Sequence, residues 1–292
     1  MMGASETVER TEKPEQPAAH PANQGPLRKT LIFANDKSSG KTTTAGAVLV
    51  SLLQHHQNRV HGIGVHEYDR QPRLSDIYGP EDGFGEVVHH DARNAAAFDA
   101  ARDIAFDPNA TVWDELLYRI GAGGVIIDLG ANIFADICRI LDEEPRPVFP
   151  DAGETIGVVV PMTTARDSLE SGMSAIEAAV SWGRQVQIFA VEQEYLGRFG
   201  QTPGWNEFRE RMQHNGHGRF HIVRIERLMV ADIGVAVFQR IDRLVAEASK
   251  VLHSGRLQGA DYIRAIRKAR AELAWGTRTL EAVRPIADWF VR

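Results

Sequence analysis

A glycine, a lysine and two threonines stand together at 40–43, between a short apolar run and a segment with helical apolar spacing. This order predicts a strand over 31–34, a loop, and a helix over about 41–57. The backbone amides of such a loop and the N-terminus of the following helix attract phosphate oxygens, and Gly40 lets the backbone approach them. The residues therefore predict a nucleotide-phosphate site, in which Lys41 meets the β- and γ-phosphates and the Thr42 hydroxyl binds Mg²⁺.

The first half of this loop departs from the usual phosphate-binding pattern. That pattern has a glycine six residues before the lysine, and Asn35 occupies this position. The apolar strand before the loop and the helix after it favour the phosphate site. An ordinary strand, turn and helix with a surface lysine is the alternative.

Two later segments end in carboxylates. The run 60–69 reads as a second strand that ends in acidic residues, among them Asp69. The run 124–130 has the form of a buried parallel strand and carries Asp128 near its end. In P-loop enzymes an aspartate at this place holds the Mg²⁺ shell, so Asp128 is a candidate metal residue. The alternative is that Asp128 caps the helix that starts near residue 132.

Strands alternate with helices from residue 30 to about 250. More strands are expected over 86–89, 156–161, 185–191 and 220–224, and helices over 95–104, 112–120, 168–182 and 235–251, with 197–218 irregular. This alternation predicts an α/β protein with a three-layer P-loop NTPase fold, in which a mostly parallel sheet has helices on both faces. Ligands of such folds bind outside the carboxyl ends of the strands, where Lys41, Asp69 and Asp128 fall.

Composition divides the chain into three parts. Residues 1–27 are rich in Glu, Pro, Ala, Gln and Asn, with almost no large apolar side chain, and are predicted to be a disordered leader. Residues 28–250 form the predicted P-loop domain. Residues 251–292 are a predicted helical extension that packs on this domain, with helices over 261–274 and 280–291.

The bulk composition favours a soluble, cytoplasmic protein. The chain has 292 residues and is 43% hydrophobic, enough for a substantial core. No apolar run approaches the ~18 residues that a membrane-spanning helix needs. The N-terminus does not have the pattern of a secretory signal. The single cysteine, Cys138, cannot form an internal disulfide, which fits a reducing compartment.

The motif order resembles the ParA/MinD group of P-loop ATPases, in the SIMIBI class. The family loop reads Lys-Gly-Gly-x-Gly-Lys-Thr-Thr, and residues 40–43 match its end. The family's second motif, Asp-x-Asp-Pro-Gln, is similar to 67–71, and its third motif is similar to 126–128. The resemblance covers about 31–241. Within the group, the divergent partition-like ATPases of plasmids and conjugative elements, the TraL type, are the most similar, which implies mobile-element maintenance or transfer.

The resemblance implies a Mg-ATPase that forms a face-to-face homodimer around ATP and turns over slowly without a partner protein. Asp69 would position the attacking water, and Lys37 would be the signature lysine that reaches the other subunit's nucleotide. The implied nucleotide contacts are Ser38, Ser39, Gly40, Lys41, Thr42, Thr43 and Pro161, with Pro161 bordering the base. The implied Mg²⁺ residues are Thr42, Asp128 and Glu67.

Three departures from the family pattern bear on these roles. The signature lysine lies five residues before the loop lysine, and here Asp36 stands there, with Lys37 one residue later. Either the loop is shorter by one residue and Lys37 keeps its role, or the contact across the dimer is lost. Ser38 and Ser39 then replace two glycines. The base-reading asparagine is also missing, and 192–193 is Glu-Gln.

Two other functions stay open on the same fold. One is a small-molecule kinase or ligase of the dethiobiotin-synthetase type, whose substrate pocket would come from the stretch 197–218. The other is a degenerate scaffold that binds ADP or nothing, towards which Ser38, Ser39 and Glu67 point.

The C-terminal region could bind DNA. The whole chain has a net charge of −6, whereas 256–292 carries eight basic and four acidic residues. The helix over 261–274 carries four basic residues, Arg264, Arg267, Lys268 and Arg270. The first three have helical neighbour spacing and therefore share one face. A solvated charged face is the alternative to contacts with DNA phosphates. The last helix is expected to pack in the core rather than to lie on a membrane.

Overall fold

The computed structural model describes residues 29–35, 39–91, 111–131, 133–143, 155–183, 186–215, 219–228, 240–253 and 259–292. The predicted leader over 1–27 and the predicted helix over 95–104 lie outside these residues. The described strands form one sheet of seven, in the order β3-β2-β4-β1-β5-β6-β7. Their bounds are β1 Thr30–Phe33, β2 Gly64–Asp69, β3 Glu86–Asp91, β4 Val125–Leu129, β5 Ile156–Met162, β6 Val186–Gln193 and β7 Phe220–Ile225.

Every pairing in this sheet is parallel. Successive side chains of a strand point to opposite faces, so a strand covered on both faces is apolar throughout. In β1, Leu31 and Phe33 join one core cluster, and Ile32 and the adjoining Ala34 join the other. The centre of the sheet is therefore buried on both sides.

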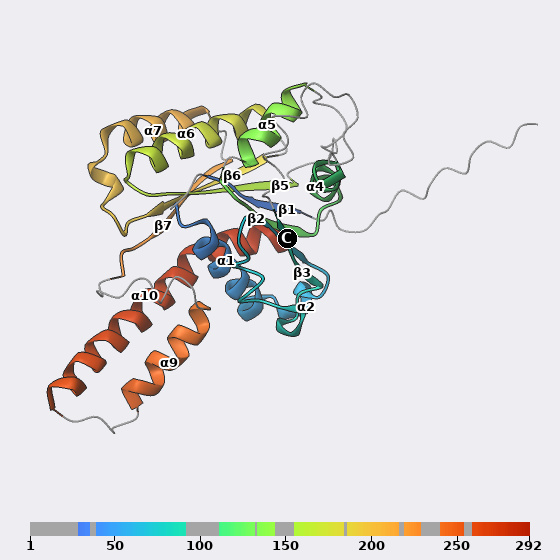
Figure 1. Ribbon diagram of the computed structural model, residues 1–292. Coiled ribbons are helices and arrows are strands. Elements are labelled where there is room, and N and C mark those ends of the chain that lie inside the picture. The colour runs from blue at the N-terminus through green and yellow to red at the C-terminus, as the bar shows by residue number, and fades with distance from the viewer. Residues whose placement is uncertain are drawn as a thin grey trace, which may run out of the picture.

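Helices cover both faces of the sheet (Figure 1). One face carries α1 (Lys41–His55), α2 (Gln57–Val60) and the C-terminal half of α10 (Gly259–Val291). The other carries α4 (Thr111–Ala122), α5 (Ile133–Glu143), α6 (Arg166–Ser181) and α7 (Pro203–Asn215). The predicted α/β, three-layer P-loop fold is confirmed. None of the described helices is long and apolar enough to cross a membrane.

The last two predicted helices are one helix, so the expected break between 274 and 280 was wrong. The glycine in this interval, Gly276, allows another helix to approach closely: a β-carbon there would lie 2.4 Å from Cγ2 of Val245 in α9 (Ile241–His253). Beyond Gly276, α10 packs on α1. Before it, α10 pairs with α9, and the two helices form an arm that projects from the body (Figure 1).

The C-terminal end of α10 is bonded to the body of the protein. The Lys29 ammonium donates to the carbonyl of Trp289 at 2.8 Å and lies 4.4 Å from the centre of its ring. The Arg59 guanidinium donates to the carbonyl of Val291. Basic groups at this end also interact favourably with the helix dipole. The last helix packs in the core, as expected.

The stretch 197–218 is not irregular where it is described. It contains a short 3₁₀ turn, η4 (Phe199–Gln201), followed by α7. Trp205, Phe208 and Met212 are buried at helical spacing on one face of α7. The pattern was present in the sequence, and the glycines and polar residues around it obscured it.

Candidate functional site

The turn after β1 ends at Gly40, the residue before α1, which has a left-handed backbone with φ 84° and ψ 23°. Glycine adopts this conformation at little cost. A β-carbon at Gly40 would also lie 2.9 Å from Nε2 of Gln193. The N-terminus of α1 then lies at the carboxyl edge of the sheet, where the helix dipole favours an anion.

The Lys41 ammonium lies beside the residues that follow β1, where it donates to the carbonyl of Asn35 at 2.6 Å. Asn35 is buried, and its amide donates to the carbonyls of Pro161 at 2.6 Å and Ser168 at 3.1 Å. The residue that replaces the usual glycine therefore fastens the start of the turn to β5 and α6.

Asp128 lies at the carboxyl end of β4 and faces the start of α1. The Thr42 hydroxyl donates to its Oδ2 at 3.0 Å, and its Oδ1 is buried without a hydrogen-bond partner among the described residues. The pKa of Asp128 is raised to about 7, chiefly by burial; the charge of Lys41 opposes this shift, and the charge of Glu67 adds to it. A cation would satisfy this oxygen and favour the charged form.

The available ligand atoms suit Mg²⁺ that is shared with a nucleotide phosphate, rather than a metal held by protein side chains alone. Mg²⁺ prefers oxygen ligands, keeps several waters and commonly shares one or two carboxylates with substrate phosphates. Thr42 and Asp128 supply such oxygens beside the phosphate loop. Among the described residues, no group of three His, Cys, Asp or Glu side chains could hold a metal ion.

Glu67 was predicted as a metal residue, and in the structure its carboxylate faces the loop after β2. The side chain is 1% exposed, and its two oxygens accept hydrogen bonds from the backbone amides of Arg73, Leu74 and Ser75. The Ser75 hydroxyl donates to Oε2 at 3.1 Å. The carboxylate therefore satisfies the loop after β2, and its lone pairs are already in use.

Asp69 ends β2 at the same edge of the sheet. Its Oδ1 accepts the amide of Arg70 at 2.6 Å, and its carbonyl accepts a hydrogen bond from Nε2 of His89 at 2.9 Å. Its charge helps to raise the pKa of Asp128. The structure therefore brings Asp69, Asp128, Lys41 and Thr42 to one edge.

The other predicted contacts have different outcomes. Pro161 lies one residue before the end of β5, and its carbonyl accepts a hydrogen bond from the Asn35 amide; its contact with a base stays a prediction. Ser39 is buried next to Gly40, and its hydroxyl has no hydrogen-bond partner among the described residues. Lys37 and Ser38 lie outside the described residues.

Gln193 is a site residue that sequence reasoning missed. It is buried at the end of β6, and its amide donates to the Thr44 hydroxyl at 2.7 Å. Thr44 in turn donates to the carbonyl of Gly40 at 2.8 Å. Gln193 thus supports the first turn of α1 from β6, which is separated from β1 by β5 in the sheet. A polar residue at the carboxyl end of a buried strand was the available signal.

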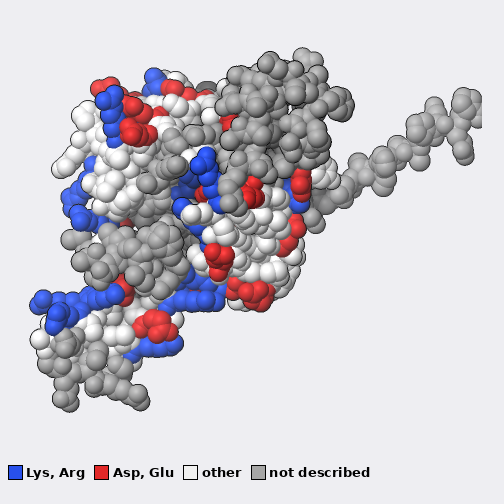
Figure 2. Space-filling model, in the orientation of Figure 1, with Lys and Arg blue, Asp and Glu red and all other residues white. Residues whose placement is uncertain are grey.

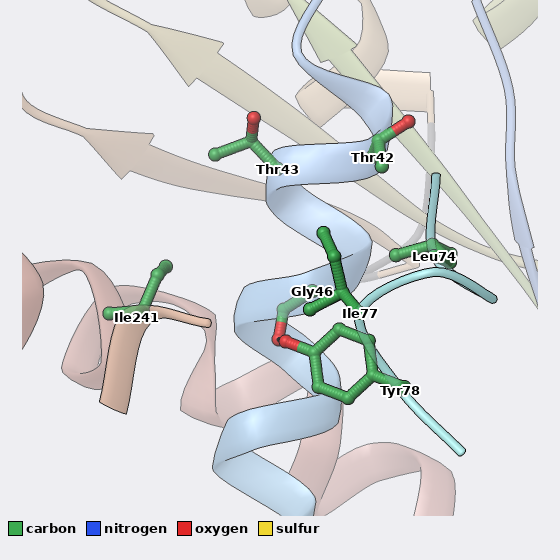
Figure 3. Close-up of a pocket in the computed structure, with 7 residues that line it drawn as sticks. All are labelled: Thr42, Thr43, Gly46, Leu74, Ile77, Tyr78 and Ile241. Atoms are coloured by element: carbon green, nitrogen blue, oxygen red, sulfur yellow. The ribbon is translucent and has the colours of Figure 1, made fainter. Parts of the chain in front are cut away.

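A small hollow separates the start of α1 from the loop after β2 (Figure 3). Its walls come from α1, from that loop and from the start of α9: Thr42, Thr43, Gly46, Leu74, Ile77, Tyr78 and Ile241. The Tyr78 hydroxyl crosses to α1 and donates to the carbonyl of Gly46 at 3.0 Å. The loop is therefore bonded directly to the phosphate helix.

Comparisons with known proteins identify a distant structural neighbour. No protein-family model matches the chain, and no curated protein matches it. A similar solved structure is provisionally named a plasmid partition protein, from Borrelia burgdorferi B31 bound to AMPPNP. The two share 12% sequence identity and a TM-score of 0.41, over 85% of this chain and 98% of that chain. The fold itself is established by the parallel sheet, with Gly40 and α1 following its central strand.

Proposed function

We propose that this protein is a Mg-ATP-dependent ATPase of the ParA/MinD type, which dimerises around ATP and separates after hydrolysis. Its cellular role would be partition, transfer or cargo positioning of a plasmid or other mobile element. One observation carries the proposal: the Thr42 hydroxyl bonds a buried Asp128 carboxylate whose second oxygen lacks a partner among the described residues, beside an anion-attracting helix N-terminus.

Each residue at this edge has a role in that reaction. The Lys41 ammonium exchanges the Asn35 carbonyl for phosphate oxygens, and the first amides of α1 bind the same group. Thr42 and Asp128 would hold the hydrated metal. When bound, Mg²⁺ neutralises charge on the β- and γ-phosphates. Asp69 accepts a hydrogen bond from the attacking water and orients it.

The test is nucleotide binding by Lys41→Ala. Removing the ammonium deletes charge-assisted hydrogen bonds, so the Kd for an ATP analogue in Mg²⁺ should rise roughly 100-fold. Lys250→Ala is the matched control, because Lys250 is an exposed lysine on α9 and should leave the Kd unchanged. Wild-type affinity in Lys41→Ala would remove the assignment.

The two alternative functions make different demands. The kinase or ligase needs a substrate pocket, and the stretch suggested for it forms α7, which packs on the face of the sheet opposite α1 (Figure 1). This stretch lines a hollow of about 470 Å³ between α6 and α7, but the hollow lies on the face of the sheet opposite α1. A scaffold would show no turnover, so hydrolysis that is lost in Asp69→Ala would exclude it.

We further propose that the arm binds DNA nonspecifically. Arg264, Arg267, Lys268 and Arg270 are all exposed on the projecting half of α10. Figure 2 shows the basic side chains of this arm at the lower left, away from the body. Such a surface suits phosphate contacts, which neutralise charge without reading sequence.

A further inference from the structure

The loop over 70–78 is organised by one buried carboxylate. Glu67 accepts hydrogen bonds from three successive backbone amides, those of Arg73, Leu74 and Ser75, at 2.9–3.3 Å, and from the Ser75 hydroxyl. A carboxylate has about four lone-pair sites, and here four donors converge on them. Hydrogen bonds to a charged acceptor are stronger than those between neutral groups. These bonds to Glu67, here called the Glu67 cap, therefore strongly restrain the loop.

The far end of the same loop is held by packing on α1. The amides of Ile77 and Tyr78 both donate to the carbonyl of Leu74, which closes a tight turn. Leu74 is fully buried and Tyr78 nearly so, and the Tyr78 hydroxyl bonds the carbonyl of Gly46. Figure 3 shows the loop side chains facing α1 one turn from Thr42 and Thr43.

Asp69 stands between these restraints. It lies two residues after Glu67 and four before Arg73, the first amide that the cap binds. In the sheet register, Glu67 of β2 lies opposite Asp128 of β4. The hydrogen bonds from the loop to Glu67 therefore form beside the proposed metal residue. The path of the chain through Asp69 therefore depends on where the loop is held.

We propose that Glu67 is a positioning residue, whose carboxylate holds the loop over 70–78 against α1 and thereby holds Asp69 at the phosphate site. This inference rests on the proposed ATPase function. It assigns Glu67 an action through the loop and none on the metal.

The test is Glu67→Gln. The new amide group faces backbone N–H donors, so part of the cap is lost while size and shape are kept. In nucleotide-free protein with EDTA, hydrogen exchange over 70–78 should become about tenfold faster or more. The kcat for ATP should fall at least about tenfold, while the Kd for an ATP analogue changes less than about threefold.

Two further variants keep the test decisive. Asp76→Asn is the matched control, because Asp76 is an exposed carboxylate of the same loop, and it should change neither exchange nor kcat. Ser75→Ala removes the hydroxyl bond to Glu67 and should raise exchange by a smaller factor. If Glu67→Gln does not fold, Ser75→Ala decides: faster exchange supports the cap, and unchanged exchange overturns it.

Other outcomes separate this role from its rivals. A metal ligand would leave exchange in EDTA unchanged in Glu67→Gln and raise the Mg²⁺ concentration needed for activity, which would overturn the proposal. Faster exchange with unaltered kcat would also overturn it, because the loop would then not position Asp69. A wild type without ATPase activity would instead remove the proposed function, and the exchange result would still show whether Glu67 holds the loop.

Discussion

Two buried titratable side chains near the sheet show how position changes chemistry. Asp128 has a raised pKa because burial removes water from its carboxylate, and its Oδ1 lacks a partner among the described residues, which suits a cation. His66 is also fully buried, but its ring is enclosed by protein groups: Nδ1 lies 3.2 Å from Nε2 of His90, and Nε2 lies 3.0 Å from the Arg119 guanidinium and 3.1 Å from the Glu86 carboxylate. Asp128 therefore has an oxygen that a cation could bind, whereas both ring nitrogens of His66 already contact protein groups.

His66 predicts a pH dependence of stability. Burial, and next the charge of Arg119, lower its pKa from 6.5 to about 4, while Glu86 and Glu115 oppose the shift and His90 adds to it. The unfolded chain therefore binds more protons between these values, and stability is lost as pH falls from about 6.5 to about 4. The loss is at most about 3 kcal/mol.

The measurement is denaturant unfolding of wild type and His66→Gln from pH 7 to pH 4.5. The glutamine does not titrate, so the difference in free energy of unfolding between the two proteins should shrink as pH falls. A constant difference across this range would show that His66 does not titrate in the folded protein as expected.

At the scale of elements, the two halves of α10 lie in different environments: its C-terminal half packs in the core, and its N-terminal half forms part of the arm. Ile286 is 0% exposed where α10 packs on α1, and Ile263 is 53% exposed on the arm. The same residue type on the same helix thus stands in opposite environments, which makes the two positions a matched pair.

Ile286→Ala should therefore destabilise the protein by about 2–5 kcal/mol, because it leaves a cavity in the core. Ile263→Ala should cost less than about 0.5 kcal/mol, because its side chain is already hydrated. Urea unfolding measures both. Equal effects would mean that the C-terminal half of α10 is not part of the cooperative core.

The elements were predictable to different degrees. β1, β4 and β5 are short and mostly apolar, so their residue pattern alone indicated buried parallel strands. The single helix α10 was not predicted, because a glycine within a helix reads as a break unless the packing of α9 is known. The hydrogen-bond partners of Glu67 could not be predicted either, since an acidic residue near the end of a strand can bind a metal or accept hydrogen bonds from the following loop.

At the scale of the whole molecule, the proposed switch predicts a change of mass. Wild type with Mg²⁺ and a non-hydrolysable ATP analogue should double its mass in light scattering, and remain a monomer with ADP. Lys37→Ala should lose this dimer if Lys37 reaches the other subunit's nucleotide, whereas Lys250→Ala should keep it. A monomer throughout, with nucleotide bound, would contradict the switch.

The arm predicts salt-dependent binding of DNA. Replacing Arg264 and Arg267 with Glu should weaken nonspecific DNA binding at least about tenfold and lower the salt slope by roughly two. Replacing Arg166 and Arg211 with Glu is the control, because these exposed arginines lie on α6 and α7. Gel shifts across a salt series measure both. If DNA binding is absent, independent of salt, or equal in the two variants, the arm is not a DNA-binding surface.

The sequence by itself determined the strand, loop and helix around Gly40 and the alternation that builds a parallel sheet. Those features are local, because they depend on residues within one or two turns of each other. The tertiary structure alone decided which polar groups meet. Gln193 supports Thr44 across 149 positions, and Asn35 fastens to Pro161 across 126. Side chains so far apart in sequence become neighbours only through the order of the strands, which no local pattern encodes.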